Sequence, residues 1–192
     1  MNTLPMKAPE LSVSEWLNTD EPITLSQLRG KVVVIEAFQM LCPGCVSHGL
    51  PQAQRISETF PKDEVIVLGL HAVFEHHDVQ GSKKALEAFL HEYRIGFPVA
   101  IDAPSNNQPT PQTMAAYQLR GTPSLILIDR EGNYQNQFFG EASDLALGAH
   151  IMRLIGRADQ NKVSNGKTES PDSAGEACDE NGCAINIAGS AK

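Results

Sequence analysis

Two runs of apolar, largely β-branched residues constrain the fold of this chain more than any other feature. The runs at 31–38 and 64–70 each have the length of a strand, and their near-continuous hydrophobicity is typical of strands covered on both faces. The segment between them, from Cys42 or Pro43 to about Thr59, favours a helix in which Gly49 and Pro51 introduce an irregularity. Two strands joined by a helix are parallel, with a right-handed crossover. The chain is therefore predicted to contain a β-α-β unit.

The rest of the folded part is predicted from periodicity and turn residues. Helices are expected over 82–93, 112–119 and 144–157, and strands over 96–101, 124–128 and 134–139. The turn-forming residues 130–133 make the last two strands a hairpin. We expect an α/β fold with a central mixed sheet flanked by helices.

The last part of the chain differs in composition from the rest. Residues 158–192 contain no Phe, Tyr, Trp, Leu or Met, so they bury too little apolar surface to offset the entropy of ordering. We predict one domain at 1–157 and an acidic, flexible tail at 158–192. The tail contains two of the four cysteines, Cys178 and Cys183.

Charge and targeting signals limit the partners and the compartment. The net charge of −8 argues against nucleic acid and anionic membrane surfaces as main partners. No apolar stretch near the start is long enough for a signal-peptide core, and no run is long enough to span a membrane. We expect a cytoplasmic monomer without a cofactor, or a periplasmic protein if a signal peptide has been removed.

The strongest indication of a catalytic function is the Cys-Pro-Gly-Cys segment at 42–45. It follows the carboxyl end of the first buried strand, where open α/β sheets place their sites, and it begins a helix. A thiolate at a helix N-terminus is stabilised by the partial positive charge and free N–H groups there. The two-residue spacing lets the second thiol attack a mixed disulfide formed by the first. Cys42 is thus the predicted attacking cysteine and Cys45 the resolving one.

Metal binding is the alternative for these cysteines. A lone pair at this spacing is also half of a zinc site, although its place between a strand and a helix favours redox chemistry. The four cysteines, with His71, His76 or His77, also supply the soft ligands of a copper-delivery module. We expect no bound metal. The metal content of the protein after purification under reducing conditions distinguishes metal binding from redox chemistry.

Three segments together resemble the thioredoxin superfamily. Residues 32–45 resemble its active-site segment and residues 121–129 the segment that carries its cis-proline. Residues 97–102, preceded by a helix, are similar to the insertion of TlpA/ResA-type thiol-disulfide oxidoreductases, and the resemblance covers about 8–157. It implies a thioredoxin-like fold with a helix-strand insertion, protein disulfides as substrates and a thiol electron donor. Reduction is the expected direction. The chain departs from the family in having Leu41 before the first cysteine and Pro-Gly between the two.

The proline at position 123 begins a strand that should run antiparallel to the first two. Its start then lies at the same sheet edge as Cys42. The resemblance implies a cis bond between Thr122 and Pro123, which exposes the Thr122 backbone to an incoming peptide; the alternative is an ordinary trans proline. With Pro43 and Gly44, these residues are the expected substrate contacts.

One acid lies inside the first apolar strand. Glu36 stands six residues before Cys42, which matches the buried acid of thioredoxins, and burial raises the pKa of a carboxyl group. We predict that Glu36 accepts the proton of Cys45 during resolution. The alternative is a structural ion pair with a lysine such as Lys31.

A peroxiredoxin-like peroxidase is the second enzymatic alternative. The segment 43–45 resembles the peroxidatic segment of one branch of that family. However, Cys42 stands where that family has Thr or Ser, and Phe38 where it has proline. Peroxide consumption by the purified protein distinguishes the two activities.

Four histidines and the tail cysteines complete the candidate residues. His71, His76 and His77 follow the second parallel strand, and His48 lies one turn beyond Cys45, so each is a candidate for stabilising a thiolate or is simply solvated. Cys178 and Cys183 flank a turn-forming Asp-Glu-Asn-Gly and are close enough for a small disulfide loop. They are a candidate redox relay to the dithiol, and an inert disulfide or a metal site is the alternative.

Overall fold

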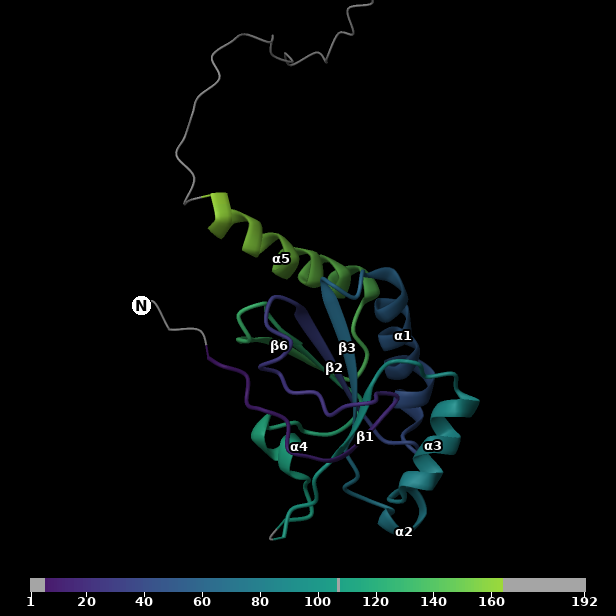
Figure 1. Cartoon of the computed structure of the whole chain (residues 1–192). Helices are drawn as coiled ribbons and strands as arrows, with labels where there is room; N and C mark the ends of the chain where they lie inside the picture. The colour runs from purple at the N-terminus through teal and green to yellow at the C-terminus, as the bar shows by residue number, and fades with distance from the viewer. Residues whose placement is uncertain (1–5, 107, 164–192) are drawn as a thin grey trace, which may run out of the picture.

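The computed structural model of the chain describes residues 6–106 and 108–163, with side chains described as far as Gly156. In this part, one six-stranded sheet has the order β1-β4-β3-β2-β5-β6. Figure 1 shows β2 and β3 between β6 and β1. Its strands are β1 (Val13–Leu17), β2 (Val32–Phe38), β3 (Val65–His71), β4 (Val99–Asp102), β5 (Ser124–Ile128) and β6 (Tyr134–Phe139). The predicted mixed sheet flanked by helices is confirmed.

Pairing of the strands follows the hydrophobic pattern. Strand β2 pairs in parallel with β3, from Val32 opposite Val65 to Phe38 opposite His71, and all of its residues are buried. Strand β4 continues the parallel arrangement, whereas β5 is antiparallel to β2 and to β6. The carboxyl ends of β2, β3 and β4 therefore meet the start of β5 at one edge of the sheet.

The predicted helices are present and differ in detail, whereas the short helix at His77–Gln80 was not predicted. They are η1 (Cys45–Gly49), α1 (Leu50–Thr59), α2 (His77–Gln80), α3 (Lys83–Glu92), α4 (Gln112–Ala116) and α5 (Asp144–Val163). The irregularity expected at Gly49 is a π-helical turn, η1, which interrupts the helix that starts at Pro43. Ser82 caps α3, since its hydroxyl accepts from the Ala85 N–H at 3.2 Å. Helix α5 extends beyond residue 157, where the domain boundary is predicted.

Two hydrophobic clusters lie on the two faces of the sheet. The cluster under α1, α3 and α5 contains Val32, Val34 and Phe38 of β2. The other, with α4 and segment 8–28, contains the alternate residues Val33 and Ile35. Glu36 belongs by this alternation to the α1 face. In the described part, no helix combines the length and apolarity that crossing a membrane requires.

Candidate active site

Cys42 and Cys45 lie where β2 ends, at the start of the helical segment. Both thiols are free; Cys42 is half-buried and Cys45 fully buried. The Cys42 Sγ accepts a hydrogen bond from the Cys45 N–H at 3.2 Å and donates to the Thr122 carbonyl at 3.5 Å. A backbone N–H aimed at a sulfur stabilises its thiolate form. The arrangement therefore suits Cys42 for nucleophilic attack.

Cys45 has the opposite environment. Burial, followed in size by a hydrogen bond with Cys42, raises the pKa of the Cys45 thiol well above its ordinary value. The thiol consequently stays protonated until a base removes its proton. Two cysteines of one motif are thus separated into an accessible thiol and a buried one, which is what attack followed by resolution requires.

Thr122 and Pro123 stand directly across from the dithiol. The peptide bond between them is cis, and Pro123 leads into β5. A Cβ added to Gly44 would lie 3.2 Å from Cδ of Pro123, so the proline ring packs against the backbone between the cysteines. The structure therefore brings together Pro43, Gly44, Thr122 and Pro123 around Cys42.

The carboxyl group of Glu36 is enclosed on the α1 face of the sheet. Its side chain is 1% exposed, Oε1 has no hydrogen-bond partner, and desolvation raises its pKa from 4.5 to about 8. It borders a cavity of about 210 Å³ that His48 and Arg55 also line. The alternative ion pair with Lys31 is wrong, because Nζ of Lys31 donates to the Lys62 carbonyl at 2.8 Å instead.

Gly49, in the π-helical turn, is a residue whose importance the sequence did not reveal. A Cβ at this position would overlap Oε1 of Glu36 and lie 2.9 Å from Cβ of Pro123. The missing side chain lets the helix approach the acid and the proline together. Only the folded arrangement exposes this requirement, since nothing distinguishes Gly49 locally from a flexible helix glycine.

Substituting Gly49 with alanine is expected to destabilise the protein by about 1–3 kcal/mol, because a methyl group must displace Glu36 or Pro123. Gly148 of α5 is a matched control, since a Cβ there meets no atom within 4 Å. Gly148→Ala should instead stabilise the protein by roughly 0.5–1 kcal/mol through helix propensity. Urea unfolding of both variants measures the difference, and equal effects at the two positions would contradict the close approach.

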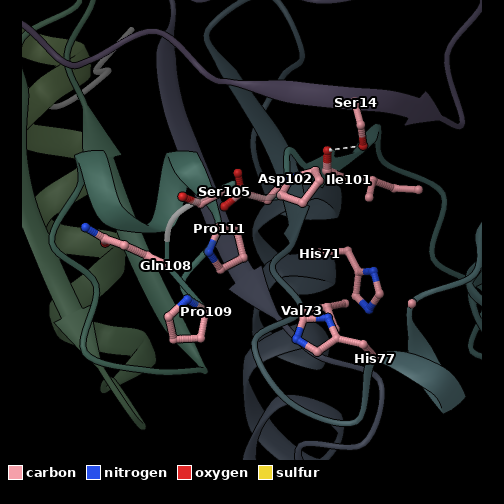
Figure 2. Close-up of a pocket in the computed structure, with 12 residues that line it drawn as sticks. Ser14, His71, Val73, His77, Ile101, Asp102, Ser105, Gln108, Pro109 and Pro111 are labelled. Atoms are coloured by element: carbon pink, nitrogen blue, oxygen red, sulfur yellow. Dashed lines mark hydrogen bonds between the residues drawn. The ribbon is translucent and has the colours of Figure 1, made fainter.

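Among the described residues, the hydrogen bonds of the Cys42 sulfur go to Thr122 and Cys45 and involve no histidine. His71 is buried against Phe38 with ring centroids 5.3 Å apart, and burial lowers its pKa to about 4. With His77 it lines a cavity of about 480 Å³ at the carboxyl ends of β3 and β4, which neither Cys42 nor Cys45 lines (Figure 2). His48 is exposed, with Nδ1 2.7 Å from the Ser47 hydroxyl. The Cys42 Sγ instead forms hydrogen bonds with the Thr122 carbonyl and the Cys45 N–H.

Within the residues that the structure describes, no three side chains of the His, Cys, Asp or Glu type are grouped so that they could hold a metal ion. Cys178 and Cys183 lie outside the described residues, so the relay stays a prediction.

Comparison with known proteins gives one family match and several relatives. Residues 5–136 match the AhpC/TSA family. Human NHL repeat-containing protein 2 is 32% identical over 130 residues, which are 66% of this chain but only 16% of that protein. The thiol-disulfide oxidoreductase ResA of Bacillus anthracis is 24% identical over 148 residues, covering 77% of this chain and 76% of ResA.

Two solved structures are more similar. A thioredoxin-like superfamily protein is 58% identical with a TM-score of 0.77, covering 79% of this chain and 97% of that one. A thiol-disulfide isomerase from Corynebacterium glutamicum is 51% identical with a TM-score of 0.73, covering 77% of this chain and 96% of the isomerase.

Proposed function

The chain belongs to the AhpC/TSA family, in the TlpA/ResA-like part of the thioredoxin superfamily, and we propose that it is a thiol-disulfide oxidoreductase that reduces protein disulfides through Cys42 and Cys45. The enzyme class follows the relatives whose names describe thiol-disulfide chemistry. The single observation that carries the site assignment is the contrast between the two thiols. Cys42 is half-buried with the Cys45 N–H 3.2 Å from its sulfur, whereas Cys45 is wholly buried.

The proposed reaction has two exchanges. The Cys42 thiolate attacks one sulfur of the substrate disulfide, that bond breaks, and the other substrate sulfur leaves as a thiolate and takes up a proton. Glu36 in its carboxylate form then accepts the proton of Cys45, directly or through a water molecule. The Cys45 thiolate attacks Cys42, the mixed disulfide breaks, and the substrate leaves fully reduced. A thiol donor returns the Cys42–Cys45 disulfide to the dithiol.

Substrate binding is proposed at the face formed by Thr122 and Pro123. The Thr122 carbonyl lies 3.5 Å from the Cys42 sulfur, so an extended peptide that pairs with this backbone would bring its disulfide to the nucleophile. Pro43 and Gly44 connect the two cysteines, and Pro123 packs against Gly44. The interaction is with the backbone, which suits an enzyme that acts on many sequences.

Reduction of insulin by the full chain, with dithiothreitol as electron source, tests this function. We expect precipitation of the insulin B chain well above the rate without enzyme, and no comparable consumption of hydrogen peroxide. Peroxide consumption without insulin reduction would favour the peroxidase instead. The peroxidase is disfavoured because its reactive cysteine would be Cys45, which is buried and whose pKa is raised. A stoichiometric metal lost in Cys42→Ser would favour the metal-binding module.

The tail relay remains a proposal of the same enzyme. If Cys178 and Cys183, as a dithiol, reduce the Cys42–Cys45 disulfide and are themselves oxidised to a disulfide, replacing both with serine slows turnover while the rate of the first attack by Cys42 is unchanged. Equal turnover with and without these cysteines would remove them from the pathway. Substituting the two cysteines is a cleaner test than truncating the chain after Arg157, because the truncation would remove the end of α5, which continues to Val163.

A further inference from the structure

Gln80 is a buried polar residue on a helix that otherwise faces solvent. Helix α2 spans His77–Gln80, and its first three residues are exposed, with Val79 58% exposed. Gln80 is 1% exposed. A buried amide is expensive unless its donors and acceptor are paired. The burial of Gln80 therefore depends on the hydrogen-bond partners of its amide group.

The side-chain amide of Gln80 both accepts and donates hydrogen bonds. Its Oε1 accepts from the Leu41 N–H at 3.1 Å, in the residue directly before Cys42. Its Nε2 donates to the Glu75 carbonyl and to Oε1 of Gln39, both at 2.9 Å. The amide orientation is set by these partners, because a flipped amide would place Nε2 against the Leu41 N–H. Both protons and the oxygen of the amide are used.

Gln39 extends the connection to the cysteine itself. It is 1% exposed, and its Oε1 also accepts from the Phe74 N–H at 3.3 Å. Its backbone carbonyl accepts from the Cys42 N–H at 3.3 Å. The two glutamines thus join segment 39–42, which carries the nucleophile, to segment 74–80, which follows β3.

We propose that Gln80 is a positioning residue for Cys42. It fixes the backbone of Leu41, and this in turn fixes the distance of 3.2 Å between the Cys42 sulfur and the Cys45 N–H. Without the Gln80 oxygen, the Leu41 N–H loses its partner in segment 74–80 and segment 39–42 relaxes. The sulfur then moves away from the N–H that stabilises its thiolate. Gln80 touches neither substrate nor sulfur and acts only through Leu41 and Gln39.

The test substitutes Gln80 with methionine, which keeps the volume and removes all three hydrogen bonds. Iodoacetamide alkylation of Cys42 in the reduced full chain is followed against pH by mass spectrometry of its peptide. The midpoint of the profile is expected to rise by about one pH unit, with about tenfold slower alkylation at neutral pH. The equilibrium with glutathione should also shift toward a more reducing dithiol, because the thiolate is stabilised less.

A matched control separates positioning from general loss of structure. Gln54 of α1 also donates two hydrogen bonds to backbone carbonyls, at 3.3 Å to Tyr93 and 3.0 Å to Arg94, and Gln54→Ala should leave the profile unchanged. If Gln80→Met does not fold, Gln80→Asn keeps the amide but withdraws it from Leu41 by one methylene. A Gln80 variant that loses stability in urea but keeps the wild-type profile and glutathione equilibrium would overturn the proposal.

This inference rests on the proposed function, since Cys42 is taken as the nucleophile. The two can fail separately. Alkylation and the glutathione equilibrium need no protein substrate, so an altered profile supports positioning even if insulin is not reduced. A normal profile with normal insulin reduction leaves the enzyme assignment intact and removes Gln80 from it.

Discussion

Cys42→Ser is expected to abolish insulin reduction, by on the order of a thousandfold or more, while leaving the fold intact. A serine hydroxyl cannot form the disulfide on which both exchanges depend. The substitution changes one atom in a half-buried side chain, so urea unfolding should differ little from wild type. Insulin turnover with dithiothreitol measures the first effect, and the unfolding midpoint measures the second.

Cys45→Ser provides the matched comparison. This variant keeps the proposed nucleophile but lacks the proposed resolving thiol, so it should accumulate a mixed disulfide between Cys42 and its substrate. The adduct is detectable on a non-reducing gel and disappears on reduction. If Cys45→Ser gave no adduct while Cys42→Ser did, the roles of attacking and resolving cysteine would be reversed.

The parts of the fold that could be predicted are those in which a local pattern and burial agree. Strand β2 is apolar at almost every position because both of its faces are covered, and its end places Cys42 at the reactive edge. Glu36 stands out because it is the charged residue of that strand. In each case a single segment contains enough information for the inference.

The features that were missed depend on contacts between distant segments. Gln39 and Gln80 are 41 positions apart, and no local pattern distinguishes a buried glutamine from an exposed one. Strand β1 is a half-exposed edge strand without a run of apolar residues, so its pairing with β4 defines it more than its sequence does. Gly49 is required only because Glu36 and Pro123 converge on it.

Glu36→Gln is expected to stabilise the protein at neutral pH. Desolvation raises the pKa of this carboxyl from 4.5 to about 8 in the folded chain, so folding favours the protonated form. Its contribution to stability is fully present below pH 4.5 and is lost as pH rises to about 8. The loss is about 3 kcal/mol at pH 7 and about 5 kcal/mol above pH 8. An uncharged glutamine removes this pH dependence.

Urea unfolding across pH 4 to 9 should therefore show curves that coincide near pH 4 and separate toward alkaline pH. Glu58 of α1 is the matched control, since it is an exposed glutamate and Glu58→Gln should leave the pH dependence unchanged.

The same Glu36→Gln protein should be slower in releasing its mixed disulfide than in forming it, because only the release needs a base for the buried Cys45. Equal slowing of both steps in rapid kinetics would contradict the proton-acceptor role. Parallel unfolding curves would contradict the raised pKa. A more stable and slower enzyme is the expected combination, since the carboxylate that we propose for resolution is the group whose burial opposes folding above pH 4.5.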